Sequence, residues 1–459
     1  MRYIKFKGLL TNSGWKNDIY LGVNTKGNIE SISSSKPDTE DVEEVNGYAL
    51  PGFQNGHSHA FQYAMAGLAE THEAGSNPDD FWSWREAMYS LALSISPDEL
   101  ESIATMLYSE MLRHGYTAVA EFHYVHHDKN GNHFNNLSEM GERLVAAAKK
   151  TGIKITLVPI FYQKGGFGKA PSERQQRFIS PTIDNYLELL EASNKSCNLY
   201  NDAKVAFGIH SMRGVEPTDI AKVSELLPEN TPFHIHVSEQ LKEIEDSVAY
   251  IGKRPVEWLL DNLNMNKNYQ LVHATHLTES EVSRIAKCGA QVVICPTTEG
   301  NLGDGIFPLR DFQSKGGNWC IGTDSHVSLN ALEELRLLDY GQRLISHKRN
   351  TFNSETEGDS GQYAMKQATI NGRISVGNYE TQYFKVGEPL DAFVIDADFP
   401  LLLNTKNEFL MSSILYSTDQ TAALGTLVNG EWKVQNNKHI LKPEIIKDFS
   451  SCIKGLGNR

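Results

Sequence analysis

Apolar and amphipathic segments alternate through the middle of the chain. Eight short apolar segments predict β-strands at residues 48–53, 117–122, 154–161, 204–209, 233–237, 270–274, 291–295 and 318–322. Helical periodicity lies between most of them, as at 96–115, where Ser96 and Pro97 mark a helix start. Near-continuous apolar strands alternating with helices are typical of a parallel sheet covered on both faces. Eight such units predict an α/β fold, a closed (β/α)8 TIM-like barrel.

An open, doubly wound sheet is the alternative to a closed barrel. In that fold a glycine-rich loop often follows the first strand and binds phosphate. The chain has no G-x-G-x-x-G sequence after its first barrel strand and no P-loop motif, so the sequence gives no support to a nucleotide-phosphate site.

Both ends of the chain differ from this middle. Beta-branched and aromatic runs separated by Asn/Gly turns predict strands at 3–6, 18–23 and 29–32, and again at 392–396, 423–428 and 432–435. We therefore expect a small β-sandwich domain built from residues 1–50 and 381–459, and a catalytic barrel at 51–380.

Composition narrows the class of protein. The chain has 459 residues, 40 % of them hydrophobic, which suffices for a large core, and its net charge is −14. It has no Lys/Arg run and no long apolar segment, so we expect neither a nucleic-acid partner nor a membrane. The five cysteines are scattered and form no C-x-x-C pair, which favours a reducing compartment. These features predict a cytoplasmic enzyme.

Ionisable residues follow several predicted strands at the end where barrel enzymes place their chemistry. His57 and His59 come after the first strand, and alternation puts both imidazoles on one side. A surface turn that carries two histidines by chance is the alternative for this pair alone. The fifth strand adds His236 and then Glu239, whereas the sixth adds His273 and the eighth Asp324. Because a buried imidazole needs a partner, this joint placement favours a functional site over separate core histidines.

These residue types match the ligands of a catalytic metal, which takes about three protein ligands and leaves a position for water. The predicted zinc ligands are His57, His59, His236 and Asp324, with iron(II) as the alternative metal. Zinc lowers the pKa of its bound water and so makes hydroxide available near neutral pH. Asp324 can take the water proton, Glu239 can carry a proton to the departing nitrogen, and His273 can orient or polarise the attacked carbon.

Longer strings around these positions resemble one family. They are HSHAFQYAMAGL at 57–68, EFHYVHHD at 121–128, RPVEWLL at 254–260 and CPTTEGNLGDG at 295–305. Together they resemble the formimidoylglutamate deiminase family of histidine degradation, within the amidohydrolase superfamily of metal-dependent barrels. The resemblance covers essentially the whole chain. It implies one metal ion, because residues 208–211 lack the bridging Lys of two-metal members. Tyr63 departs from the pattern, since a basic residue is expected there.

The resemblance implies a reaction, the hydrolysis of N-formimidoyl-L-glutamate to N-formyl-L-glutamate and ammonia. In it, metal-bound hydroxide attacks the amidine carbon of a small substrate that carries two carboxylates. The family places five residues in the substrate pocket: Gln62, Arg85, Tyr124, His210 and Arg213. Arginine binds carboxylate bidentately and stays charged, which suits Arg85 and Arg213 as anchors. Family analogy also implies a homodimer.

Two other functions remain open from the sequence. One is a deaminase or dechlorinase of a heteroaromatic substrate such as guanine or a triazine, which has no carboxylates for two arginines to bind. The other is a metal-free scaffold that inherited the barrel, which predicts decayed ligands. All the predicted ligands and proton carriers are present, and this favours an enzyme.

Overall fold

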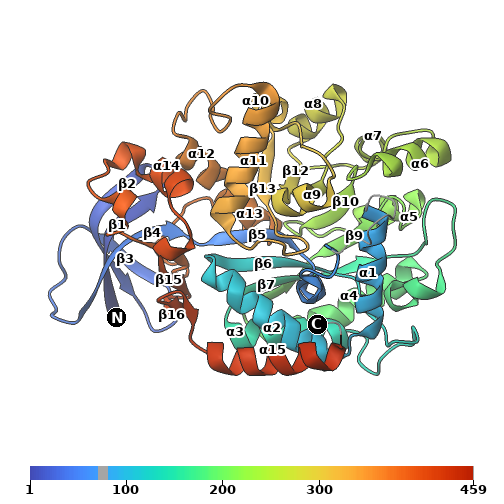
Figure 1. Ribbon diagram of the computed structural model, residues 1–459, viewed down its shortest axis with the longest axis horizontal. Coiled ribbons are helices and arrows are strands. Elements are labelled where there is room, and N and C mark those ends of the chain that lie inside the picture. Colours follow the sequence, from blue (N-terminus) through green and yellow to red (C-terminus); the bar gives the residue numbers. More distant parts are fainter. Residues whose placement is uncertain (71–80, 458–459) are drawn as a thin grey trace.

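Eight parallel strands form the wall of a nearly closed barrel (Figure 1). The computed structural model describes residues 1–70 and 81–457, apart from the side chains of residues 81–83. In spatial order the strands are β5 (Phe53–Ser58), β6 (Tyr116–His123), β7 (Lys154–Phe161), β9 (Phe207–Ser211), β10 (Phe233–Val237), β11 (Tyr269–His273), β12 (Gln291–Ile294) and β13 (Asn318–Ile321). The first and last strands meet where the amides of Thr323 and Asp324 donate to the His57 carbonyl at 3.1 and 3.0 Å. The predicted barrel is confirmed.

Helices cover the outside of the barrel, and their ends follow the sequence signals. Ser96 caps α2 (Pro97–Arg113) by accepting from the Glu99 amide, and Gly152 ends α3 (Glu139–Thr151) at φ 81°. The other helices of the middle region are α1 (Phe81–Ser94), α4 (Ile183–Cys197), α5 (Pro217–Glu225), α6 (Leu241–Ile251), α7 (Pro255–Asn262), α8 (Glu279–Cys288), α9 (Pro296–Leu302), α10 (Leu309–Ser314), α11 (Ala331–Ser346), α12 (Ser360–Lys366) and α13 (Gly372–Ser375). Among residues 1–70 and 81–457, no helix combines the length and the apolar character needed to span a bilayer.

The two ends of the chain form a second sheet beside the barrel (Figure 1). Its strands, in spatial order, are β17 (Lys438–His439), β16 (Glu431–Gln435), β15 (Ala423–Val428), β14 (Ala392–Asp396), β4 (Val42–Pro51), β1 (Arg2–Thr11), β2 (Gly14–Val23) and β3 (Ile29–Ser33). All neighbours are antiparallel except β1 and β4. The predicted pairing of strands from both termini is therefore confirmed, and these strands form one continuous sheet.

Two strand boundaries differ from the sequence prediction. The predicted strand 48–53 is divided, because β4 ends at Pro51 in the terminal sheet and β5 begins at Phe53 in the barrel. Gly52 permits this crossing, since a Cβ there would lie 2.3 Å from the Thr117 side chain. The predicted strand 204–209 is also divided, into β8 (Ala203–Val205), which pairs with β7, and β9. His57 and His210 consequently lie inside strands rather than after them.

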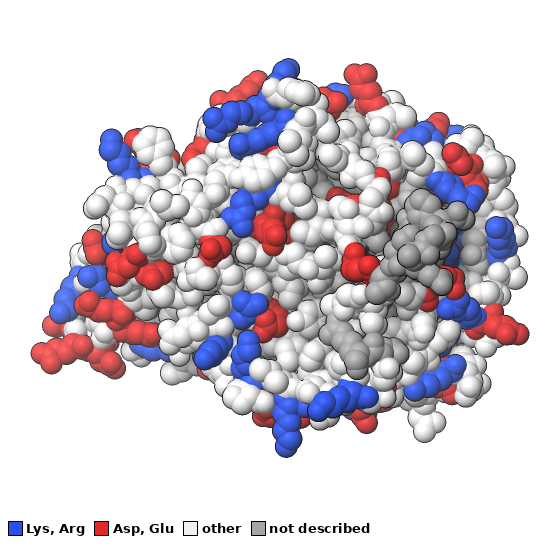
Figure 2. All heavy atoms as spheres, viewed as in Figure 1, with Lys and Arg blue, Asp and Glu red and all other residues white. Residues whose placement is uncertain are grey.

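A long C-terminal helix, α15 (Lys442–Leu456), lies along α2 at the edge of the barrel (Figure 1). Lys150 of α3 binds Glu444 and Asp448 of this helix at 2.9 and 3.2 Å. The range 381–459 therefore includes a helix packed on the barrel, in addition to strands of the terminal sheet and α14 (Asn407–Ser417). On the face drawn in Figure 2, the described Lys and Arg side chains are interspersed with Asp and Glu rather than gathered in one basic area.

Candidate metal-dependent active site

A cavity opens at the carboxyl ends of the barrel strands, where barrel enzymes carry out their chemistry. All the predicted site residues except His57 line it: His59, Gln62, Arg85, Tyr124, His210, Arg213, His236, Glu239, His273 and Asp324. His57 lies fully buried directly beneath, in contact with His59 and His236. The structure thus brings together residues that the sequence spreads over more than half of the chain.

Four donor atoms converge at the floor of this cavity. His57 Nε2 lies 3.1 Å from His59 Nε2 and 3.0 Å from His236 Nε2. Asp324 Oδ1 lies 3.3 Å from His57 Nε2 and 3.2 Å from His59 Nε2. Ligands about 2.05 Å from a tetrahedral zinc ion lie about 3.3 Å from one another. The donor spacings of His57, His59 and Asp324 therefore suit one such ion, and His57, His236 and His273 form an adjoining group of donors within 4.8 Å of one another.

The ring orientations present lone pairs to the centre of this donor set. His59 Nδ1 donates to the Phe122 carbonyl at 2.8 Å and His236 Nδ1 donates to the His210 carbonyl at 3.0 Å, which leaves each Nε2 as the metal-facing atom. Burial lowers the pKa of His57 to about 3 and also lowers the pKa of His59 and of His236. The three imidazoles are consequently neutral, the form that binds a metal.

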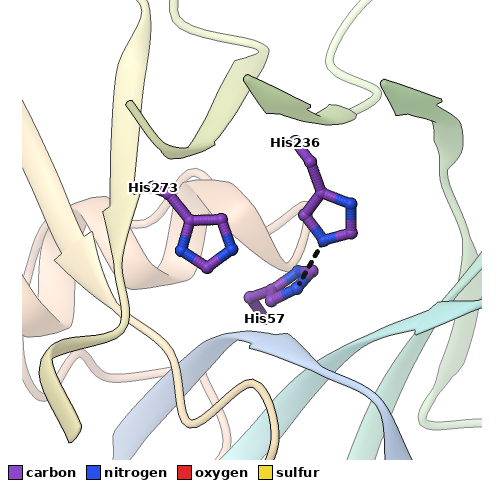
Figure 3. A group of neighbouring side chains, drawn as sticks. All are labelled: His57, His236 and His273. Carbon is purple, nitrogen blue, oxygen red and sulfur yellow. Dashed lines mark hydrogen bonds between the residues drawn. The ribbon is translucent and has the colours of Figure 1, made fainter. Parts of the chain in front are cut away.

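Two ionisable side chains, His273 and Glu239, lie beside these ligands. Figure 3 shows the His273 ring turned toward His57 and His236. His273 Nε2 lies 3.9 Å from Glu239 Oε1 and 3.8 Å from Asp324 Oδ2. Burial alone would lower the pKa of His273, but Glu239, Glu299 and Asp324 raise it to about 10. Burial raises the pKa of Glu239, although His273 and Arg213 oppose that rise. Glu239 therefore has the character of a proton carrier.

Several residues of this site hold left-handed backbone conformations without being glycine. Ser238, His273, Ala274 and Asp324 have φ of 52°, 67°, 47° and 45°. Such conformations cost about 1–3 kcal/mol each and persist where the surrounding structure holds them. They follow strands β10, β11 and β13, where they turn Glu239, His273 and Asp324 into the cavity. The residue types at these four positions do not predict a left-handed backbone conformation.

A buried carboxylate beneath the His57–His59 pair was missed by the sequence prediction. Glu121 of β6 accepts from Ser58 Oγ at 2.6 Å, from the Ala60 amide at 2.6 Å and from Tyr108 Oη at 3.1 Å. It thereby fixes the turn that directs the two imidazoles inward. The available signal was a lone carboxylate in the otherwise apolar strand Tyr116–His123. Burial of a carboxylate requires partners of this kind.

The predicted substrate residues line the mouth of the cavity. Gln62 Nε2 donates to Tyr124 Oη at 3.2 Å. The side-chain oxygen of the same residue, Oε1, is buried without a hydrogen-bond partner among the described residues. The His210 ring stacks on Tyr162 with 4.1 Å between centroids. Arg85 donates to Tyr89 Oη at 2.5 Å. The sequence prediction missed the aromatic lining Trp84, Tyr89, Tyr162 and Phe178. Tyr63 lies apart from the described lining, and its ring packs near His326 and Phe449.

Comparison with known proteins shows the family. Residues 48–433 match the sequence model of the Amidohydrolase family. The chain belongs to this family. The amidohydrolase is 40 % identical over 433 residues to a formimidoylglutamate deiminase from Pseudomonas aeruginosa, and the match covers 94 % of both chains. It is 23 % identical to a 5-methylthioadenosine/S-adenosylhomocysteine deaminase from Haloarcula marismortui, over 85 % of this chain and 82 % of the relative.

Solved structures place the amidohydrolase among enzymes of the same fold. An amidohydrolase from Brucella melitensis superimposes with a TM-score of 0.93 at 38 % identity, over 99 % of this chain and 100 % of that one. An adenosine deaminase from Xanthomonas campestris, described with bound zinc, superimposes with a TM-score of 0.79 at 20 % identity, over 100 % and 98 %. The second likeness shows the fold alone. The chain is therefore a hydrolase of the amidohydrolase family.

Proposed function

We propose that this enzyme hydrolyses N-formimidoyl-L-glutamate to N-formyl-L-glutamate and ammonia. The observation that carries the proposal is the composition of one cavity, which joins metal-donor side chains to two arginine side chains. Such a cavity suits a substrate with an amidine at one end and carboxylates at the other. The 40 % identity to a relative named formimidoylglutamate deiminase supports the same substrate.

We further propose that the site holds one zinc ion, with iron(II) as the alternative. His57, His59, His236 and Asp324 would hold it, because donor atoms of the other three side chains lie 3.0–3.3 Å from His57 Nε2. Bound zinc supplies a Lewis acid that lets water act as a nucleophile near neutral pH. Three neutral imidazoles and one carboxylate suit zinc or iron(II) rather than calcium or magnesium.

The protein groups around this centre account for the proton transfers. Water adds to the amidine carbon, the bond from that carbon to the terminal nitrogen breaks, and ammonia leaves while the formyl oxygen remains. Asp324 accepts the proton of the attacking water through Oδ2, and Glu239 carries a proton to the departing nitrogen. His273 faces both carboxylates through Nε2 and orients the amidine carbon between them.

The other end of the cavity binds and orients the substrate. Arg85 and Arg213 pair with its two carboxylates, each able to form two parallel N–H···O bonds. Tyr124 and His210 add hydrogen-bonding groups, and Gln62 contributes a buried carbonyl oxygen that lacks a partner among the described residues. In a protein of net charge −14 this local positive charge gives the selectivity for an anionic substrate.

Measured release of ammonia tests the proposal. The zinc-loaded protein is given N-formimidoyl-L-glutamate, N-formimidoyl-L-aspartate or guanine in parallel. Rapid release from the glutamate derivative alone is the expected result. The aromatic lining of the cavity favours a heteroaromatic amidine as the second candidate. Turnover of guanine without turnover of the glutamate derivative would keep the metal chemistry and overturn the assignment of the two arginines.

Glu239→Gln is expected to lower kcat by about 1000-fold, because the amide cannot carry the proton that the departing nitrogen needs. KM and zinc content should stay within about twofold, since Glu239 is not a predicted ligand or carboxylate anchor. Steady-state kinetics and metal analysis measure both. Glu243→Gln is the matched control, because Glu243 is also buried and hydrogen-bonds the Glu239 amide at 3.2 Å. Full activity of Glu239→Gln would remove the proton-carrier role.

We also propose a cytoplasmic homodimer. Leu337, Tyr340 and Leu344 form one stripe of helix α11, and their side chains are exposed. Association of two copies would remove such apolar area from water. Light scattering on the purified protein should give a mass of about twice the chain mass of 51.3 kDa, and a monomer across the concentrations used in the assay would contradict this.

A further inference from the structure

Glu299 lies against His273 on the side away from the metal donors. Its Oε1 atom is 3.2 Å from His273 Nδ1 and accepts the Cys295 amide at 2.9 Å. Both side chains are buried, with exposed fractions of 4 % for Glu299 and 1 % for His273. The proton transfers described above do not use Glu299, so its burial beside the reacting centre calls for another role.

The hydrogen bond from the Cys295 amide bears on the contact between Glu299 Oε1 and His273 Nδ1. An oxygen that already accepts one backbone N–H is complemented by a second donor, so His273 Nδ1 carries a proton that it donates to Glu299 Oε1. The opposite nitrogen, Nε2, then faces Glu239 Oε1 and Asp324 Oδ2 at 3.9 and 3.8 Å. One contact behind the ring therefore decides which nitrogen faces the reacting atoms.

His273 has a particular need for such a contact. Its backbone is left-handed, with φ 67°, and the next residue is left-handed too. Its ring stacks beside His236 with 5.6 Å between centroids and an interplanar angle of 18°, a contact that tolerates rotation of the ring by half a turn. Helix α9 begins at Pro296 and holds Glu299 in place through the Glu299 amide, which donates to the Cys295 carbonyl at 2.9 Å.

We propose that Glu299 is a positioning residue that fixes the orientation of the His273 ring, with Nδ1–H donated to its carboxylate and Nε2 turned to the substrate. The effect on rate rests on the proposed deiminase reaction, whereas the effect on the imidazole does not. The contact corresponds to the carboxylate–imidazole pairs that fix histidine orientation in other enzymes and whose loss costs about 10–100-fold in activity.

Three variants separate positioning from simple support of the fold. Glu299→Ala should lower kcat about 100-fold with KM and zinc content unchanged. Glu299→Gln should recover most of this loss, because its amide oxygen can accept from both Nδ1 and the Cys295 amide. Glu334→Gln is the control. Glu334 is equally buried and holds the same helix by accepting from the Thr297 amide at 2.9 Å, but it does not contact His273. This control should change kcat by less than about threefold.

Nitrogen-15 NMR of the zinc-loaded protein with labelled histidine directly reports the protonation and hydrogen bonding of the imidazole nitrogens. The His273 signal is assigned by its loss in His273→Asn. In the wild type we expect a single His273 Nδ1–H signal typical of a hydrogen bond to a carboxylate, and in Glu299→Ala the shift or loss of that signal. An unchanged His273 signal in Glu299→Ala, or losses of activity equal to those of Glu334→Gln, would overturn the proposal. If the wild type released no ammonia from N-formimidoyl-L-glutamate, the proposed function would fail while this spectrum still decided the role of Glu299.

Discussion

Removing the metal with a chelator such as dipicolinate should reduce ammonia release at least about 1000-fold, and added zinc should restore it. The expectation follows from the donor set, in which donor atoms of His59, His236 and Asp324 lie close to His57 Nε2. The fold should survive, because the barrel wall is packed and hydrogen-bonded independently of these four side chains. Circular dichroism and metal analysis accompany the kinetic measurement.

Two neighbouring histidines on β10 give a matched pair of variants for this prediction. His236 faces the metal donors, whereas His234, two residues earlier on the strand, bonds the Ser375 carbonyl through Nε2 at 3.0 Å. His236→Asn should lose zinc and activity together. His234→Asn should keep about one zinc per chain. This variant removes only the contact with Ser375, in the segment that follows the last barrel strand, and no predicted metal ligand. Equal zinc content in the two variants would exclude His236 as a ligand.

A bound ion should also stabilise the fold by mass action, since the unfolded chain has no such site. At a free zinc concentration about 100-fold above its Kd, the folded state gains about 2.7 kcal/mol, so the melting temperature should rise on zinc addition. His234→Asn should show the same rise and His236→Asn should not. This readout is independent of any substrate.

The strand pattern predicted the barrel because its strands are buried on both faces and therefore read as apolar runs. The ligands could be predicted even though one boundary was wrong. His57 lies within β5 rather than after it, yet a spacing of two residues puts His57 and His59 on one face wherever the strand ends. The boundary itself was not predictable, because β4 and β5 are nearly contiguous and only tertiary pairing with β1 and β14 assigns Val42–Pro51 to the terminal sheet.

Supporting groups were harder to predict than ligands. Glu121 reaches Ser58 across 63 positions, and Glu299 reaches His273 across 26, so no local pattern links either pair. Both contacts depend on which strands are neighbours in the barrel. The left-handed conformations of His273 and Asp324 were likewise invisible, since residue type disfavours them and only the assembled site maintains them.

The cavity is divided electrostatically, and this division would let an acidic protein bind the proposed anionic substrate. Carboxylates of Glu239, Glu299 and Asp324 surround His273 at the floor, whereas Arg85 and Arg213 stand at the mouth. A substrate with a basic amidine and acidic carboxylates has only one favourable orientation in such a field. In the proposed reaction this orientation would bring the amidine carbon to the metal donors, so that charge couples binding to reaction.

Arg213→Met should lower kcat/KM for N-formimidoyl-L-glutamate about 1000-fold, equivalent to roughly 4 kcal/mol. Methionine keeps the length and apolar stem but leaves one substrate carboxylate in the cavity without a cation. Arg213→Lys, which keeps the charge and loses the planar fork, should recover only part of the loss. Steady-state ammonia release measures each variant, with zinc content confirming that the metal donors are intact.

A substrate without carboxylates makes this test specific. N-methylformamidine carries the amidine alone, so the wild type and Arg213→Met should hydrolyse it at equal, low rates. Loss of turnover for both substrates would mean that Arg213 supports the fold of the site rather than a carboxylate. Unchanged kcat/KM for the glutamate derivative would contradict the anchoring role and favour the heteroaromatic substrate, whose binding depends on the rings of Tyr89, Tyr124 and Tyr162.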